Sequence, residues 1–244
     1  MKIFAHRGLS GFYPENTMLA FKKCLNLNIY GIELDVQKSK DNHLVVIHDE
    51  TVDRTFKGSG YVKDMTLTEL KSLNSSTEIY ENNEDCKIPT LREVLTLFKP
   101  TPFIINIELK NNKIRYKNLE LDVITLVKEL KMEKQVIISS FRFKSIKKVS
   151  KICPKIKTGY LIEPRSYKLI PKTLLLCSLI KYKCYSINPH CDLVDKNFVK
   201  KFHRRGIKVL SYTVNSIEKH DKFSKIHVDG VFTDFSTVFS SLYD

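Results

Sequence analysis

The sequence has no tryptophan and few of the residues that mark unusual classes of chain. Only eight glycines and eight prolines occur among its 244 residues, which excludes collagen-like and linker-like chains. Hydrophobic residues make up 42% of the chain and charged residues 28%, so the composition is globular and not disordered. The length fits one large domain or two small ones, and either choice buries a sizeable core.

Long apolar runs are also missing. No stretch approaches the roughly 20 apolar residues that a membrane-spanning helix needs. The first five residues lead directly into the polar His6, so the chain shows no apolar signal-peptide segment. We therefore expect a cytoplasmic protein without a transmembrane segment.

Cysteine occurs six times, but never with the C-x-x-C spacing of a zinc site. The cysteines are scattered through helix and strand patterns, which predicts buried free thiols. A disulfide framework is less expected in a chain of this length without an export signal. The six residues are Cys24, Cys86, Cys153, Cys177, Cys184 and Cys191.

Acidic residues are outnumbered by basic ones, 27 to 41, which gives a formal net charge of +14. Such an excess suits an anionic partner. However, arginine is scarce among the basic residues, and no basic run carries the interleaved aromatic residues that stack on bases. We therefore expect no nucleic-acid partner, and instead solvated lysine faces that attract a small anion diffusely.

Short extended runs alternate with amphipathic helical runs along the chain. The predicted strands are 2–5, 32–36, 44–47, 103–109, 136–139, 156–160, 184–187, 209–214 and 231–233. The predicted helices begin near residue 16 and then cover 91–98, 119–130, 143–150, 171–179, 196–203, 217–223 and 235–242. Asn16 or Thr17 is a candidate cap for the first helix.

Between residues 49 and 88 this alternation is interrupted by a loop-rich stretch with one capping box, Thr66 to Glu69. About eight strand–helix units remain, which favours a closed parallel sheet over an open one. We predict an α/β fold of the TIM (β/α)₈ barrel type, a class in which about 250 residues is typical. Residues 1–244 would form one catalytic domain, with a small insertion at about 49–88 after the second strand. No nucleotide-binding fingerprint follows the first strand.

Two carboxylates occur on the second predicted strand. Glu33 and Asp35 share one face because strand side chains alternate, and the apolar residues around them take the other face. Both carboxylates therefore point into the barrel, where unpaired charge is costly. Either a hard divalent cation or an arginine or lysine partner would compensate them.

The strand 103–109 repeats this pattern. Asn106, Glu108 and Lys110 share one face, which adds a third carboxylate and a cation. His6 and Arg7 follow the first strand, and His48 follows the run 44–47. The carboxyl ends of barrel strands meet at one rim, where barrel enzymes place their catalytic groups.

Together these residues have the chemistry of a phosphodiesterase site. Three carboxylates without cysteine suit Mg²⁺ or Ca²⁺ better than zinc. Arginine and lysine would neutralise phosphoryl oxygens, and two histidines would exchange protons near neutrality. The residues alone thus indicate metal-assisted cleavage of a phosphodiester.

The motifs also occur in a characteristic order over essentially the whole chain. They are His6-Arg7-Gly8, Pro14-Glu15-Asn16-Thr17, Glu33-Leu34-Asp35, His48-Asp49, Asp53-Arg54-Thr55, Gly58-x-Gly60, Lys87-Ile88-Pro89-Thr90-Leu91, Ile107-Glu108-Leu109-Lys110, Ser140-Phe141, Thr213-Val214-Asn215 and Asp229-Gly230-Val231-Phe232-Thr233-Asp234. In this ordered set the sequence resembles the glycerophosphodiester phosphodiesterase family.

The resemblance implies a TIM barrel with an insertion after the second strand. It implies hydrolysis of a glycerophosphodiester to glycerol 3-phosphate and an alcohol, with the substrate's own glycerol hydroxyl attacking first to give a cyclic phosphate. It also implies roles for seven residues: a divalent cation on Glu33, Asp35 and Glu108, acid and base roles for His6 and His48 in either order, and phosphate contacts for Arg7 and Lys110.

Two positions depart from the family pattern. Tyr212 stands where tryptophan is usual, so the wall of the substrate pocket is smaller and gains a hydroxyl. Ser236 stands where proline is usual, which affects structure more than catalysis. The departure at Tyr212 concerns the choice of substrate and leaves the chemistry unchanged.

Two other functions remain as alternatives. A lysophospholipase D or sphingomyelinase D-like enzyme would share the metal and the histidines and would need an apolar face near the rim. Acidic residues of the insertion such as Glu78 and Glu84 favour water-soluble diesters instead. A non-catalytic module that binds anionic lipid or nucleic acid through its lysines is the other alternative, but it leaves the three inward carboxylates unexplained.

Overall fold

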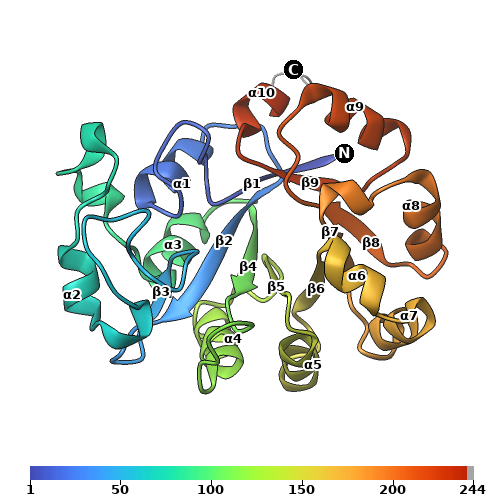
Figure 1. Cartoon of the computed structure of the whole chain (residues 1–244), viewed down its shortest axis with the longest axis horizontal. Coiled ribbons are helices and arrows are strands. Elements are labelled where there is room, and N and C mark those ends of the chain that lie inside the picture. Colours follow the sequence, from blue (N-terminus) through green and yellow to red (C-terminus); the bar gives the residue numbers. More distant parts are fainter. Residues whose placement is uncertain (241–244) are drawn as a thin grey trace.

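The computed structural model describes residues 1–240, and it confirms the predicted (β/α)₈ barrel (Figure 1). Eight parallel strands follow one another in the order β1-β9-β8-β7-β6-β5-β4-β2, and pairing of β1 with β2 closes the barrel. These strands are β1 (Lys2–Ala5), β2 (Gly31–Lys38), β4 (Ile104–Leu109), β5 (Val136–Ser140), β6 (Lys157–Ile162), β7 (Ser186–Pro189), β8 (Lys208–Ser211) and β9 (Gly230–Thr233).

Helices surround the barrel, and most of them connect consecutive strands (Figure 1). They are α1 (Met18–Cys24), α3 (Leu91–Phe98), α4 (Leu119–Glu129), α5 (Phe143–Ile152), α6 (Pro164–Leu169), α7 (Lys172–Lys181), α8 (Lys196–His203), α9 (Ile217–Lys225) and α10 (Ser236–Ser240). Within residues 1–240, no helix is both long and apolar enough to cross a membrane.

Alternation along β2 divides its side chains between two environments, as the sequence predicts. Ile32, Leu34 and Val36 are completely buried and pack in the large core cluster between the strands and the surrounding helices. Glu33 and Asp35 take the opposite, inward face, and they are also buried. Burying two charged carboxylates is unfavourable, so other groups inside the barrel must stabilise them.

Side-chain caps start the first helices. Thr17 accepts a hydrogen bond from the Ala20 amide at the N-terminus of α1, so Thr17 and not Asn16 is the cap. Thr66 and Glu69 form the predicted capping box of α2 (Leu67–Ser72). These local bonds satisfy amides that would otherwise lack intrahelical partners.

The third predicted strand lies outside the barrel. β3 (Leu44–Val46) pairs antiparallel with the end of β2 and leads into the irregular segment 49–88. This segment contains α2 and the short 3₁₀ helices η1 (Val62–Asp64), η2 (Glu78–Tyr80) and η3 (Glu84–Cys86). Val52, Phe56 and Leu70 belong to its own small apolar cluster, and Figure 1 shows the segment beside α1 and α3.

Several expected boundaries differ in the structure. α6 was not predicted, because its six residues form too short a pattern to show helical periodicity. β8 ends at Ser211, so Tyr212 lies beyond the strand and not within it. β7 begins at Ser186, two residues later than expected. Of the predicted helix 235–242, the structure describes 236–240, and positions 241 and 242 lie outside the described residues.

The cysteines are free, as expected, but not all of them are buried. Cys177 is exposed on α7, whereas the other five are buried. The prediction of burial was wrong for Cys177 because its helix is only partly covered by its neighbours. The 3₁₀ helix η4 (Cys191–Leu193), after β7, contains another of the buried thiols.

Candidate active site

A cavity of about 280 Å³ opens at the carboxyl ends of the barrel strands. It collects residues from the ends of β1, β2 and β4 on one side and of β5 to β8 on the other. Seven of the eight residues predicted for the site line this cavity: His6, Arg7, Glu33, His48, Glu108, Lys110 and Tyr212. The eighth, Asp35, is completely buried and contacts two of them, Arg7 and Lys110.

Three carboxylates meet at the base of the cavity. Asp35 and Glu108 are register partners on the adjacent strands β2 and β4, and Glu33 precedes Asp35 by two residues on the same face. One oxygen from each of the three lies within 4.8 Å of the others. Burial, followed by the charges of Asp35 and Glu108, raises the pKa of Glu33 well above its usual value. The positive charge near Glu33 is therefore too small to stabilise its ionised form.

Asp35 is compensated by side chains of the protein. Lys110 Nζ lies 3.5 Å from Oδ1, and Arg7 Nε lies 3.4 Å from Oδ2. Asn16, held at a φ of 55°, donates a hydrogen bond to Oδ2 at 2.9 Å. Burial opposes ionisation, but Lys110 and Arg7 hold the pKa of Asp35 far below its usual value. The arginine or lysine partner considered from the sequence thus accounts for Asp35. At Glu33 the charge and the amide of Arg7 do not outweigh burial and the two neighbouring carboxylates.

The donor set fits a hard divalent cation. Two cationic side chains, Arg7 and Lys110, face three carboxylates, so a negative charge remains. Asp35 Oδ1 is buried and accepts no hydrogen bond from the described residues. Buried carboxylate oxygens that accept no hydrogen bond are suitable ligands for Mg²⁺ and Ca²⁺, which prefer oxygen.

Arg7 is oriented by its backbone and by two acidic neighbours. Its φ of 56° turns the chain, so that its amide donates to Glu33 Oε2 at 3.0 Å. Gly8 follows with a φ of 78°, and a Cβ there would lie 2.9 Å from the backbone of Ala20. Only glycine fits that position without strain.

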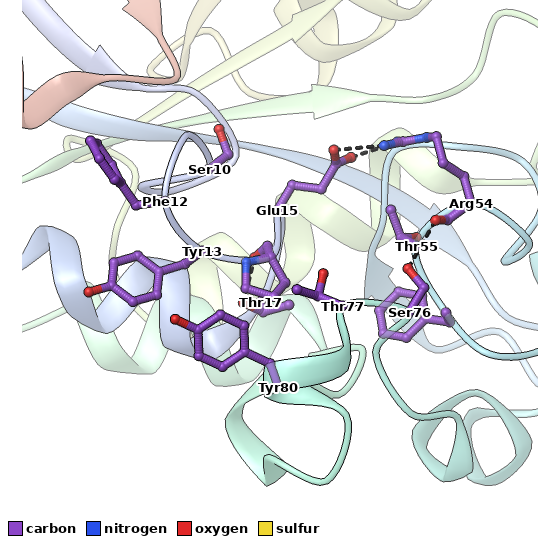
Figure 2. Close-up of a pocket in the computed structure, with 12 residues that line it drawn as sticks. Ser10, Phe12, Tyr13, Glu15, Thr17, Arg54, Thr55, Ser76, Thr77 and Tyr80 are labelled. Atoms are coloured by element: carbon purple, nitrogen blue, oxygen red, sulfur yellow. Dashed lines mark hydrogen bonds and ion pairs between the residues drawn. The ribbon is translucent and has the colours of Figure 1, made fainter.

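Glu15 holds the guanidinium of Arg7 from the other side. It accepts from Arg7 at 2.9 Å and from Arg54 at 2.7 and 2.9 Å. Figure 2 shows Glu15 and Arg54 joined across a second cavity of about 340 Å³ between the loop after β1 and the segment 49–88. Glu15 therefore bonds both to Arg7, which lines the first cavity, and to Arg54, which lines the second.

His6 is fixed by an aspartate at the end of β9. Its Nδ1 lies 2.7 Å from Asp234 Oδ1, and its Nε2 lies 4.0 Å from Glu33. Ser10 and Asn215 also donate to Asp234. Burial alone would raise the pKa of Asp234, but the hydrogen bonds from His6, Asn215 and Ser10 lower it to about 2. Asp234 is therefore ionised at neutral pH.

His48 is held by an aspartate in the same way as His6. Its Nδ1 lies 2.6 Å from Asp49 Oδ1, and Arg54 Nε donates to the other oxygen at 2.6 Å. Burial opposes ionisation of Asp49, but Arg54 and His48 lower its pKa to about 2. An ionised carboxylate only accepts hydrogen bonds. In each neutral histidine the proton is therefore on Nδ1, and Nε2 is left to exchange protons.

Aromatic residues form the opposite wall of the cavity. The ring of Tyr212 packs edge-on against Phe141 and against His190, each with ring centres 5.7 Å apart. The hydroxyl of Tyr212 donates to the Ile162 carbonyl at 3.2 Å. The hydroxyl expected to mark the pocket is thus bonded to the protein, and the ring supplies the wall. Glu163, which is exposed directly before α6, also lines the cavity.

Sequence reasoning missed the residues that orient the predicted ones. Asp49, Asp234 and Glu15 lie within the matched motifs, but the sequence did not show which side chain each of them holds. Glu163 and His190 come from the ends of β6 and β7, where no motif marked them. Their position in the barrel was the only available signal.

A second group of possible metal ligands lies at η4. His190, Cys191 and Asp192 bring ligand atoms together. However, Lys219 Nζ lies 3.1 Å from both the Cys191 sulfur and Asp192 Oδ1. This ammonium group already occupies the place of a cation, so we assign no metal here.

Known proteins resemble the chain along its whole length. Residues 6–238 match the model of the "Glycerophosphoryl diester phosphodiesterase family". Glycerophosphodiester phosphodiesterases of Caldanaerobacter subterraneus and Bacillus altitudinis are each 40% identical to it. The first alignment covers 95% of this chain and 93% of the relative, and the second covers 96% and 94%.

Solved structures share the fold. A glycerophosphodiester phosphodiesterase of Thermotoga maritima is 31% identical with a TM-score of 0.78, over 98% of this chain and 97% of that one. A phosphodiesterase of Oleispira antarctica, solved with its product sn-glycerol-3-phosphate, is 27% identical with a TM-score of 0.85, over 100% and 97%. With the barrel and its rim residues in place, these matches show that the chain is an enzyme and belongs to the glycerophosphoryl diester phosphodiesterase family.

Proposed function

We propose that the protein hydrolyses a glycerophosphodiester to sn-glycerol 3-phosphate and an alcohol. A divalent cation, Mg²⁺ or Ca²⁺, would be held by Glu33, Asp35 and Glu108. The observation that carries this proposal is the set of three buried carboxylates whose charge the protein does not fully compensate. When bound there, such a cation would polarise a phosphoryl oxygen and lower the pKa of a hydroxyl beside it.

The cationic side chains bind the phosphate in this mechanism. The guanidinium of Arg7 and the ammonium of Lys110 border the cavity directly beside the carboxylates. Both side chains would contact the anionic oxygens and stabilise the charge that grows there in the transition state. Glu15 and Glu108 position the two cations before substrate arrives.

The two histidines move the protons. Each presents Nε2 as the free ring nitrogen, because Asp234 and Asp49 hold Nδ1–H. One Nε2 would take the proton from the attacking hydroxyl, and the other, protonated, would give a proton to the leaving alcohol oxygen. The aspartates stabilise each imidazolium as it forms. Where the attacking hydroxyl is the substrate's own, this step leaves a cyclic phosphate, and one water then opens the ring with the two histidines in exchanged roles.

The pocket also bears on the choice of substrate. A cavity of about 280 Å³ accommodates a small diester with a short head group. The ring of Tyr212 and the side chain of Phe141 would pack against the carbon atoms of the substrate. We further propose that the chain is one catalytic domain, with 49–88 as an insertion that supplies Asp49 and Arg54 behind His48.

A lysophospholipase D-like activity is the second candidate. The observation that favours it is an exposed apolar surface on α6 and α7, which follow the rim residue Glu163. The acyl chain of a lysolipid would leave the cavity along that side. Both activities would hydrolyse a phosphodiester with the same site residues. They would differ in whether the glycerol of the substrate carries an acyl chain.

Release of sn-glycerol 3-phosphate from glycerophosphocholine and glycerophosphoethanolamine tests the proposal. The reaction is measured with Mg²⁺, with Ca²⁺ and with a chelator, and lysophosphatidylcholine serves as a parallel substrate. We expect metal-dependent release from the water-soluble diesters. Release that persists in chelator would contradict the metal site. A lysophospholipase D releases choline and leaves lysophosphatidic acid, so choline release from the lysolipid alone would establish the second candidate.

A further inference from the structure

An apolar patch lies on the outside of the barrel, on the two helices that follow the cavity residue Glu163. It consists of Leu169, Ile170, Pro171 and Leu174, at the end of α6 and the start of α7; we call it the α6–α7 patch. Leu169 is 79% exposed and Leu174 is 63% exposed. Single exposed leucines are common on protein surfaces, but neighbouring ones of this exposure mark an interaction site.

The patch is held in place by the protein and is continuous with a shallow groove. Lys172 donates hydrogen bonds to the carbonyls of Tyr167 and Ile170, and its ammonium lies 3.8 Å from the centre of the Tyr167 ring. These contacts fix the turn that presents Leu169. The groove, of about 180 Å³, lies between Phe143 of α5 and Leu174, and its walls are mainly apolar.

The charges on the segment that carries the patch all have one sign. Residues 164–183 contain no aspartate or glutamate. Their basic residues are Arg165, Lys168, Lys172, Lys181 and Lys183, and all except the half-buried Lys172 are exposed. Lys201 of the neighbouring α8 lies close enough to Lys172 for the two charges to interact. Apolar side chains with cations beside them match a membrane surface, where negatively charged head groups cover an apolar interior.

We propose that the α6–α7 patch docks the protein on the surface of a membrane that contains anionic lipids. Leucines of the patch would enter the boundary between head groups and acyl chains, while the surrounding cations would contact lipid phosphates. α6 begins directly after Glu163, which lines the catalytic cavity, so docking places the mouth of the cavity near the lipid surface.

A second copy of the chain fits this surface less well. A twofold interface brings the same patch of both subunits together. Here it would bring the basic residues around Leu169 against their own copies, with no acidic residue in 164–183 to pair with them. Like charges brought together in this way oppose association.

Co-sedimentation of the full-length protein with vesicles tests the proposal. One set of vesicles is phosphatidylcholine alone, and the other contains roughly one-third phosphatidylglycerol. We expect binding to the anionic vesicles only, and weaker binding as salt rises because exposed charges are screened. No binding to the anionic vesicles, or equal binding to both sets, would overturn the proposal.

Variants locate the binding surface. The double variant Leu169→Ser/Leu174→Ser should reduce partitioning by about tenfold or more, the effect of losing two inserted apolar side chains. Arg165→Gln/Lys168→Gln should reduce it by about fivefold for each charge removed. Ile79→Ser removes an equally exposed apolar side chain, 81% exposed, from the insertion and should bind like the parent.

The remaining controls show whether a loss of vesicle binding comes from the patch itself, and not from unfolding, from lower net charge or from a damaged active site. Lys128→Gln/Lys131→Gln lowers the net charge equally at exposed positions at the end of α4, and it should leave most of the binding intact. All variants should keep the melting temperature and the turnover of a soluble diester. Binding that falls equally in the controls, or a dimer that the serine variant abolishes, would contradict the membrane assignment.

Discussion

The two sides of the barrel rim differ in the kind of polar group that they carry. On one side, which we call the charged side, β9, β1, β2 and β4 carry charged or titratable residues within the strand or just after it, such as Asp234, His6, Glu33 and Lys110. On the other, the wall side, β5 to β8 carry buried serines and an asparagine, with aromatic residues above them. In the proposed mechanism the charged side would carry out the chemistry, and the wall side gives the pocket its shape.

Hydrogen bonding explains why the two sides behave differently. On the wall side, neutral groups form hydrogen bonds with near neighbours, as when Ser186 donates to Asn188 at 2.7 Å. On the charged side, several ions depend on partners from distant parts of the chain, such as Asp35 on Arg7 and Lys110. A buried charge that loses its partner costs far more than a neutral group that does so. Substitutions on the charged side should therefore have the larger effects.

The largest effect is expected from the carboxylates. Glu33→Ala, Asp35→Ala or Glu108→Ala should abolish metal binding and detectable activity, because each removes one of three ligands. Calorimetric titration with Mg²⁺ or Ca²⁺ and the release of glycerol 3-phosphate measure the two effects.

A buried carboxylate outside the site provides the control. Glu120 of α4 is 2% exposed and is paired with Ser145 and Lys148. Glu120→Gln should lower the melting temperature while metal binding and turnover persist. Full activity in any of the three ligand variants would remove the metal assignment.

Next in size are the histidines. His6→Ala or His48→Ala should reduce turnover by about 10²–10⁴-fold, the usual range for general acid–base catalysis. Calorimetry should show that both variants still bind metal, because the ligand set is intact. A loss of metal binding would instead indicate that the histidine is itself a ligand.

His203 is a matched control for that pair. It forms the same kind of contact with an aspartate, Asp229, at 2.6 Å, but at the end of α8 and away from the cavity. His203→Ala should leave turnover unchanged. An equal fall in turnover would show that the effect comes from folding and not from proton transfer.

A smaller effect on activity is expected when Arg7 is replaced by lysine, which keeps the charge but not the planar guanidinium group. Arg7→Lys should lower kcat/KM by about 10- to 100-fold, because the planar fork that contacts Glu15 and would contact phosphate is lost. Arg92→Lys, at an exposed arginine paired with Glu129, should have no effect on kcat/KM. Unchanged kinetics for Arg7→Lys would show that Arg7 does not bind the phosphate.

The smallest effects belong to the wall side. Tyr212→Phe should lower the free energy of unfolding by about 1 kcal/mol, the usual contribution of one hydrogen bond, and leave KM unchanged, since the hydroxyl bonds to Ile162. Tyr212→Ala removes the ring as well and should raise KM. Denaturant unfolding and steady-state kinetics separate these effects. A changed KM in Tyr212→Phe would place the hydroxyl on the substrate.

The charged side was the more predictable of the two from sequence. Glu33, Asp35 and Glu108 stood out because charged residues alternate there with fully apolar ones along a strand. The wall side has no such contrast: Ser139, Ser186 and Asn188 are neutral and occur everywhere in proteins. Pattern analysis finds residues that are unusual for their surroundings, and wall residues are not unusual.

Strand boundaries and exposure were predicted less well. β3 has the composition of a barrel strand, but it pairs antiparallel with the end of β2 and lies outside the barrel. Cys177 and Leu174 occupy apolar positions in a helix that its neighbours cover only on one face. In each case the local sequence was compatible with burial, and packing against distant segments decided the outcome.

By itself the sequence determined the alternation of strands and helices, the inward direction of the three carboxylates and the order of the motifs, because these follow from local periodicity and from residue chemistry. Only the tertiary structure decided which aspartate holds which histidine, that Glu15 joins Arg7 to Arg54, and that Asp35 is compensated while Glu33 is not. Most of these outcomes, such as the pairing of His6 with Asp234 and of Glu15 with Arg54, depend on distances between side chains that are far apart in the chain. Closure of the barrel sets those distances, and electrostatic interactions in a buried site depend on them steeply.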